Sequence, residues 1–231
     1  MVLIPVAKRF EVDNVLFDCS GTIINDMEPV YRAHVDNCVL HDLPVMGFDK
    51  WREMSPRITG ARDVYRIICE NSGLTKDYDI LYDDYSKFYQ QAREDYPPVP
   101  RVGVSITFDA LAEQGKMMGV VSAHPQVNLE CDLSRFGFDG YMSFMEGGVH
   151  DKGKRIAEIC SERGLDISRT CYVGDTNRDI QSARRAGVIA IGDVGGYVNE
   201  RVIDNTLMKL EKAGYPHSKI YEMPELLEIL I

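Results

Sequence analysis

No two cysteines of this chain form a Cys-x-x-Cys pair, although the sequence contains six cysteines. Zinc sites of the finger and ribbon type use such pairs, so the spacing argues against a structural zinc site. The cysteines are scattered through apolar surroundings, as is typical of reduced, buried thiols in a cytosolic protein. We therefore expect a cytoplasmic protein.

Long apolar runs and an excess of basic residues are also missing. No stretch has the length of a transmembrane helix, and residues 1–12 lack an apolar core, so we predict neither a membrane partner nor a signal peptide. The chain has 26 Lys and Arg against 36 Asp and Glu, a formal net charge of −10. Because binding to a phosphate backbone requires a basic surface, no nucleic-acid partner is expected.

What the sequence does have is a series of short apolar runs bounded by turn residues. With 231 residues and 45% apolar composition, the chain can bury one large core, or a core and a modest second unit. Strands are predicted at Asn14–Asp18, Met117–Val121, Cys171–Val173, Val188–Ile191 and Ile220–Met223. Helical patterns separate the later strands, which indicates an α/β fold with a parallel sheet covered on both faces.

The region between the first two strands has no strand signal. Its apolar residues recur at helical spacing, as in the run from Leu81 to Ala92. The proline-rich segment 96–100 ends this region, because consecutive prolines cannot continue a helix. We expect a small helical domain over residues 26–96, inserted into a core domain that comprises residues 1–25 and 97–231.

Polar side chains stand where three of the predicted strands end. Asp18 ends the first strand, Ser122 follows the second, and Asp175 follows a later one, with Asp179 four residues on. The carboxyl ends of parallel strands share one edge of the sheet, where open α/β sheets bind ligands, so these side chains are expected to meet. Together with Lys152 they would make a site for a cation and a phosphate, and carboxylate oxygens suit Mg²⁺.

In this order the segments resemble the four motifs of the haloacid dehalogenase-like superfamily, in its phosphatase branch. The matching segments are Asp18-Cys19-Ser20-Gly21-Thr22, the strand that ends in Ser122, Lys152, and Gly174-Asp175 with Asp179. Each motif is weak alone, but the four together, in order along nearly the whole chain, are specific. The resemblance implies a Rossmann-like core with a mobile helical cap, and a phosphoglycolate phosphatase-like hydrolase that uses Mg²⁺.

The resemblance also implies a role for each motif residue. Asp18 is the nucleophile that forms an aspartyl-phosphate, while Mg²⁺ and Lys152 stabilise the charge of the transition state. The implied metal ligands are Asp18, the backbone carbonyl of Ser20, Asp175 and Asp179, the last of which holds either Lys152 or a metal-bound water. The implied phosphate-binding residues are Cys19, Gly21, Thr22, Ser122, Ala123 and Lys152.

Ser20 departs from the family pattern, which has a second aspartate two residues after the nucleophile. That aspartate protonates the leaving group and then activates water, and such general acid–base help is worth about 10²–10⁴ in rate. A serine hydroxyl cannot act as a general base near neutral pH without an activator. Ser20 therefore occupies the catalytic position of the acid–base aspartate. With serine there, we predict a site that binds Mg²⁺ and phosphate yet hydrolyses simple monoesters slowly.

Several explanations of Ser20 stay open. The substrate can have a good leaving group, such as an acyl phosphate, or another group such as His124 can supply the proton. The protein can be a non-catalytic phospholigand-binding protein, or Ser20 can be an engineered substitution that traps substrate. It can also be a phosphonatase-like C–P hydrolase with a Schiff-base lysine in the cap. The lysines available there are Lys50, Lys76 and Lys87.

Substrate choice is expected to come from the helical region. Arg57 or Arg62, in a polar loop, could clamp a substrate carboxylate in a bidentate way, although a solvated loop is an equal alternative. A small acidic phosphorylated metabolite such as phosphoglycolate is the substrate that this hypothesis favours. We expect a monomer or a homodimer.

Overall fold

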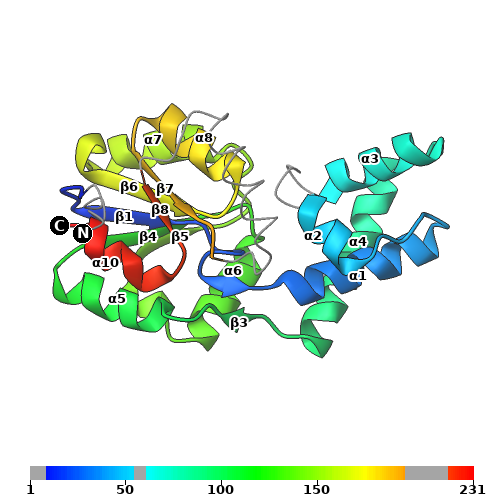
Figure 1. Cartoon of the computed structure of the whole chain (residues 1–231), viewed down its shortest axis with the longest axis horizontal. Coiled ribbons are helices and arrows are strands. Elements are labelled where there is room, and N and C mark those ends of the chain that lie inside the picture. Colours follow the sequence, from blue (N-terminus) through cyan, green and yellow to red (C-terminus); the bar gives the residue numbers. More distant parts are fainter. Residues whose placement is uncertain (1–8, 55–60, 196–217) are drawn as a thin grey trace, which may run out of the picture. The chain divides into compact units, whose positions relative to one another are not determined.

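The computed structural model divides the chain into two compact units (Figure 1). The first comprises Met1–Ile24 and Pro100–Ile231, and the second comprises Asn25–Val99. The residues that the structure describes are 9–54, 61–195 and 218–231. That the two units are separate domains stays a prediction.

A six-stranded sheet forms the centre of the first unit. Its strands are β1 (Asn14–Phe17), β4 (Met117–Val121), β5 (Met142–Glu146), β6 (Thr170–Gly174), β7 (Ile189–Asp193) and β8 (Ser218–Ile220). Their order is β5-β4-β1-β6-β7-β8, and each neighbouring pair is parallel. The predicted parallel α/β fold is confirmed. The edge strand β5 was not predicted, because its residues are mostly half-buried and lack β-branched side chains.

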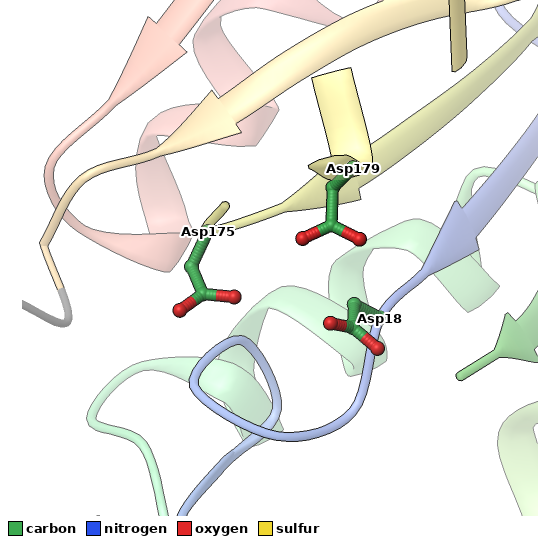
Figure 2. A group of neighbouring side chains, drawn as sticks. All are labelled: Asp18, Asp175 and Asp179. Carbon is green, nitrogen blue, oxygen red and sulfur yellow. The ribbon is translucent and has the colours of Figure 1, made fainter. Parts of the chain in front are cut away.

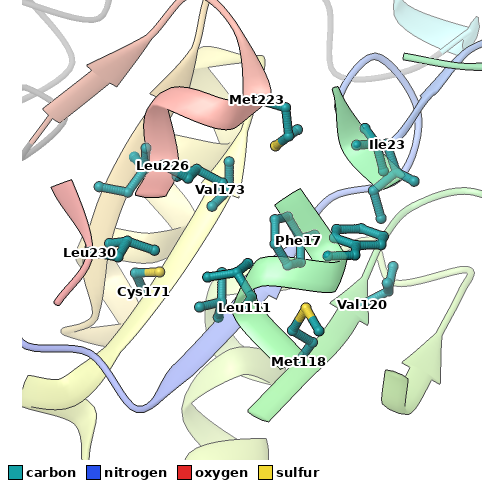
Figure 3. Close-up of a cluster of buried hydrophobic side chains, with 14 of the residues drawn as sticks. Phe17, Ile23, Leu111, Met118, Val120, Cys171, Val173, Met223, Leu226 and Leu230 are labelled. Carbon is teal, nitrogen blue, oxygen red and sulfur yellow. The ribbon is translucent and has the colours of Figure 1, made fainter. Parts of the chain in front are cut away.

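Helices cover both faces of the sheet. One face carries α5 (Val104–Glu113), α6 (Gln126–Arg135) and α10 (Leu226–Ile229), and the other carries α7 (Lys152–Arg163) and α8 (Asn177–Ala186) (Figure 1). Successive side chains of β1 point to opposite faces of the sheet. Val15 and Phe17 belong to the core cluster of α5, α6 and α10, shown in Figure 3, whereas Leu16 belongs to the cluster of α7 and α8. A strand buried on both faces must be apolar throughout, which explains the run before Asp18.

The second unit is helical. Its described helices are α1 (Met27–Leu40), α2 (Phe48–Met54), α3 (Ala61–Ser72) and α4 (Tyr78–Asp95). Helix α4 ends just before the prolines, as their missing N–H groups require. The short helix α2 was not predicted. The chain passes between the units through β2 (Ile24–Asn25) and β3 (Val99–Pro100), which pair as a two-stranded sheet.

Within the described ranges, no helix combines the length and the apolarity that a membrane crossing requires.

Candidate active site

Three carboxylates converge at the carboxyl edge of the sheet (Figure 2). Strands β1 and β6 are neighbours with Phe17 opposite Val173, and the N–H of Asp18 donates to the Val173 carbonyl at 2.8 Å. This register places Asp18 beside Asp175 and Asp179. All three side chains are buried, and one oxygen from each lies within 4.8 Å of the others.

Lys152 and Ser122 hold the Asp18 carboxylate from two sides. The Ser122 hydroxyl donates to Asp18 Oδ1 at 2.6 Å, and Lys152 Nζ lies 2.8 Å from Asp18 Oδ2 and 2.6 Å from Asp179 Oδ1. Lys152 is the first residue of α7 and is 5% exposed. Lys154, the alternative in sequence, has a side chain that is 72% exposed and reaches only Glu158. The structure therefore places Lys152, and not Lys154, in the cluster.

Asp179 has two structural roles at once. Its Oδ1 faces Lys152, while its Oδ2 accepts the backbone N–H of Thr176 at 3.0 Å and the Thr176 hydroxyl. The Thr176 hydroxyl oxygen in turn accepts the N–H of Asp179 at 3.2 Å, which completes a capping box at the start of α8. A Cβ at Gly174 would clash with Asp179, so a glycine is required before Asp175. The helix cap thus orients a carboxylate of the cluster.

The charges of this cluster strongly affect each other. Burial is the largest influence on Asp18 and raises its pKa above the usual range; Lys152 opposes that rise and Asp179 adds to it. Burial alone would lower the pKa of Lys152, but the Asp179 and Asp18 carboxylates outweigh it and raise that pKa. Lys152 contacts two of the three carboxylates, and a cation bound by all three would further stabilise their ionised forms.

The loop after Asp18 turns sharply against the cluster. Gly21 has a φ of +79°, a region that favours glycine, and a Cβ there would clash with the carboxylate of Asp175. The N–H of Gly21 donates to Ile24 O at 2.8 Å, and that of Thr22 donates to Cys19 O at 3.2 Å. Two of the backbone amides expected at a phosphate are therefore used within the loop itself.

The other expected phosphate-binding groups lie in different surroundings. The Thr22 side chain is fully buried, and its hydroxyl has no hydrogen-bond partner among the described residues. Cys19 is buried, whereas Ser20 is half-buried. Ala123 is exposed, next to Ser122 at the end of β4. The roles of these residues toward phosphate stay predictions.

His124 is held in the interior of the first unit. Its Nε2 lies 3.2 Å from Oδ2 of Asp132, which is two turns further on in α6, and both side chains are buried. Its backbone N–H donates to the Ser122 hydroxyl oxygen at 3.2 Å. The contact with Asp132 accounts for this histidine as a structural residue, so the geometry gives no support to its use as a proton donor.

The residues expected at the substrate are not placed. Arg57 lies outside the described residues, and Arg62 is described only as part of the backbone of α3. Of the lysines considered for a Schiff base, Lys87 is 77% exposed, and its contact with Asp84 raises its pKa. A Schiff-base lysine needs a lowered pKa, so Lys87 does not fit that role.

Two residues near the site were not predicted from the sequence. Arg101 donates from Nη1 to the carbonyl of Gly21 at 2.8 Å and forms an ion pair with Asp193, which is fully buried. One signal was available: Asp193 ends the apolar strand β7, so it stands at the same sheet edge as Asp175. Nothing in the sequence connected it with an arginine 92 residues away.

The donors present fit a hard divalent cation. Three carboxylates within reach of one another offer oxygen ligands, and Mg²⁺ prefers one or two carboxylates together with substrate oxygens and water. Asp18, Asp175 and Asp179 are the described residues that would hold such an ion. The chemistry of this set therefore agrees with a divalent metal.

A parallel α/β core with a carboxylate cluster at its carboxyl edge agrees with a metal-dependent enzyme, and comparison with known proteins gives the family. The family model for haloacid dehalogenase-like hydrolases matches residues 15–192. The chain therefore belongs to the haloacid dehalogenase-like hydrolase family, and the resemblance inferred from its motifs is confirmed.

Individual relatives are named as phosphatases. A phosphoglycolate phosphatase of Synechococcus elongatus is 28% identical over 203 residues, covering 81% of this chain and 85% of its own length. An N-acetylmuramic acid 6-phosphate phosphatase of Pseudomonas aeruginosa is 27% identical over 200 residues, covering 83% and 86%. These names support the expectation of a phosphatase-like hydrolase.

Solved structures share the fold. The crystal structure of a predicted phosphoglycolate phosphatase from Haemophilus somnus superimposes with a TM-score of 0.75 at 20% identity, covering 94% of this chain and 97% of that one. A haloacid dehalogenase-like family hydrolase from Streptococcus pneumoniae also gives 0.75, at 14% identity and with the same coverage. At these identities the likeness concerns the fold alone.

Proposed function

We propose that this chain is a Mg²⁺-dependent phosphatase of small phosphorylated metabolites that uses Asp18 as its nucleophile. The observation that carries the proposal is the position of Asp18, buried at the sheet edge between Ser122 and Lys152 and beside two further carboxylates. Exposed acidic residues often cluster without a ligand, but carboxylates that are buried together are stabilised when they bind a cation.

Each residue of the site has a proposed role in the transfer of the phosphoryl group. When bound by Asp18, Asp175, Asp179 and the Ser20 carbonyl, Mg²⁺ supplies the positive charge that lets an anion approach a phosphate. One carboxylate oxygen of Asp18 attacks phosphorus, and the bond from phosphorus to the leaving oxygen breaks, with the electron pair departing on that oxygen. Lys152 and the Ser122 hydroxyl stabilise the phosphoryl oxygens during the transfer. Water then releases phosphate and regenerates Asp18.

Ser20 sets the expected substrate range within this proposal. Without a carboxylic acid two residues after the nucleophile, the leaving oxygen receives no proton from that position, so its own pKa controls the rate. The carboxylate of an acyl phosphate and the phenolate of an aryl phosphate can leave without being protonated. The alkoxide of an alkyl monoester cannot. We therefore expect turnover of the first two kinds to exceed that of alkyl monoesters such as phosphoglycolate.

A second function is favoured by the same residue. With Ser20 in place of an acid–base group, the site can bind Mg²⁺ and a phosphorylated ligand without turning it over. The protein would then act as a phospholigand-binding protein. Carbon–phosphorus cleavage has less support, because Lys87 is exposed and ion-paired.

The helical unit is proposed to choose the substrate as a cap. Its predicted contribution is Arg57 or Arg62 as a clamp for a substrate carboxylate, as a small acidic phosphate would require. Phosphoglycolate is a candidate, because several relatives carry that name. A cytoplasmic monomer or homodimer is the setting that agrees with the composition.

The test is a panel of acyl phosphates, aryl phosphates, alkyl phosphates and phosphonates, incubated with the protein in Mg²⁺ and in EDTA. Phosphate release that requires Mg²⁺ supports the phosphatase. Mg²⁺-dependent binding of panel members by calorimetry, with release no faster than without protein, supports the binding protein instead. Absence of both binding and release would contradict both functions.

A further inference from the structure

Arg101 joins the loop after the nucleophile to a distant strand of the sheet. It lies directly after β3, and its backbone N–H donates to the carbonyl of Ile23 at 2.9 Å. Its guanidinium donates to the carbonyl of Gly21 at 2.8 Å and also contacts Asp193 at the end of β7. One residue therefore holds the loop through two carbonyl groups and connects it to the carboxyl edge of the sheet.

Asp193 lies at the end of β7 and forms an ion pair with Arg101. It is fully buried, its Oδ2 faces Arg101, and its Oδ1 accepts the N–H of Gly195 at 3.0 Å. A buried carboxylate is costly unless it is paired and hydrogen-bonded, and here a guanidinium and a backbone amide do both. Asp193 thus fixes the direction of the Arg101 side chain, which is itself largely buried.

The loop that Arg101 holds has little room to move. The left-handed conformation of Gly21 brings its backbone against the carboxylate of Asp175, where even a Cβ would clash. The Gly21 carbonyl belongs to the Gly21–Thr22 peptide, which meets the Ser20–Gly21 peptide at the Gly21 Cα. Because that Cα has little room against Asp175, a shift of the carbonyl is expected to be passed on to the Ser20–Gly21 peptide. By donating to this carbonyl, the Arg101 guanidinium can orient that part of the loop.

We infer that Arg101 and Asp193 form a positioning pair, which fixes the Ser20–Gly21 peptide against Asp175 and thereby sets the affinity of the site for its divalent metal. This inference rests on the proposed function for the identity of the metal site. It goes beyond that function by assigning a role to two residues that lie outside the four motifs.

The first measurement is metal affinity, because it does not depend on turnover. The double variant with Arg101→Met and Asp193→Asn removes both charges together, so no unpaired buried charge remains. Mn²⁺ binding to the metal-free protein, followed by electron paramagnetic resonance, is expected to weaken by about 10–100-fold, as for loss of groups that orient metal ligands. Arg101→Lys keeps the charge but not the planar fork, and should also weaken binding.

A control separates positioning from general stability. Arg169 forms an ion pair with Asp13 at 2.5 Å, at the opposite edge of the sheet. Arg169→Met is expected to leave Mn²⁺ affinity unchanged, whatever its effect on thermal unfolding. Where a panel substrate is turned over, the double variant should lower kcat at saturating metal and leave KM within about twofold, since the pair acts on the site and not on substrate binding.

The outcomes are distinct. Mn²⁺ binding by the double variant equal to that of the wild type shows that the pair is only structural and overturns the inference. Wild-type binding of Mn²⁺ without turnover of any panel member contradicts the proposed phosphatase, but leaves the pair to be judged by metal affinity alone. No Mn²⁺ binding by the wild type contradicts both.

Discussion

The two units of this chain differ in how they hold polar groups in their interiors. In the first unit a group of buried charges is paired, as in the contacts of Lys152 with Asp18 and Asp179. In the second, the buried His34 lies among aromatic rings, with its ring centroid 5.7 Å from that of Tyr65 and 6.3 Å from that of Trp51. Burial lowers the pKa of His34 to about 4, so this histidine is neutral near neutral pH.

The difference bears on where the chain can accept a ligand. Paired buried charges cost desolvation energy that a hydrophobic replacement would avoid, so their presence favours a role beyond stability. A neutral histidine among aromatic rings has no such cost and is explained by packing. This contrast favours the first unit as the location of the proposed chemistry.

The largest expected effect comes from breaking the charged cluster at its centre. Asp18→Asn keeps the size of the side chain but removes the attacking oxygen, so turnover should fall by on the order of 10⁴–10⁶-fold, as for loss of other nucleophiles. The measurement is phosphate release from the best panel substrate. The matched control is Asp13→Asn, directly before the first residue of β1 and far from the cluster, and this variant should retain activity. Substantial turnover by Asp18→Asn would rule out the aspartyl-phosphate route.

The next effect concerns the acid–base position. Ser20→Asp should raise turnover of p-nitrophenyl phosphate and, more strongly, of an alkyl monoester, because it supplies a proton donor and then a base worth about 10²–10⁴ in rate. The two kcat values are compared at saturating Mg²⁺. Ser20→Asn, which is similar in size but not acidic, should give no gain. If Ser20→Asp folds, binds Mg²⁺ and still gains nothing, the account of Ser20 is wrong.

The second unit should respond to acid through His34. The unfolded chain protonates this histidine near its ordinary pKa of about 6.5, whereas the folded unit keeps it neutral down to about 4. Its contribution to stability is therefore complete above pH 6.5 and is lost as the pH falls from 6.5 toward 4, by about 3 kcal/mol in total. Urea unfolding followed by fluorescence of Trp51, the single tryptophan, measures this loss.

A substitution isolates the histidine. His34→Gln cannot titrate, so its stability should change less between pH 6.5 and 4 than that of the wild type. Equal slopes for His34→Gln and the wild type would show that the acid loss comes from other groups.

The smallest expected effect is metal stabilisation of the first unit. If the carboxylates of the cluster around Asp175 bind a cation, Mg²⁺ at about 100 times its dissociation constant should raise the free energy of unfolding by about 2.7 kcal/mol. Thermal unfolding in Mg²⁺ and in EDTA measures it. Asp175→Asn should remove the difference, and Asp139→Asn, an exposed carboxylate of the same unit, should preserve it. A wild type that melts identically in both solutions contradicts the metal site.

The sequence predicted the sheet and the meeting of Asp18, Ser122, Lys152 and Asp175, because parallel strands bring their carboxyl ends to one edge whatever their exact length. The resemblance to the family motifs pointed to Lys152, which the structure places beside Asp18. The meeting of the strand ends, in contrast, depends only on strand order and on local pattern.

Contacts between residues that are distant in the sequence could not be predicted from local pattern. The pairing of Arg101 with Asp193 joins residues with no shared motif, and the capping box of Thr176 with Asp179 was not predicted. The structure shows that Asp179 closes this capping box and also faces Lys152. The strand β5 and the short helix α2 lack the periodicity that longer elements show, so local pattern alone did not identify them.

The pairing of β2 with β3 brings the two ends of the inserted helical unit side by side. An insertion whose ends are adjacent can be lengthened, shortened or exchanged without changing the register of the six-stranded sheet, since the closure of a longer loop costs little. The proposed reacting centre and the helical unit proposed to choose the substrate could therefore diverge separately. If that proposal holds, a foreign insert grafted between Ile24 and Pro100 should change the substrate specificity of this chain.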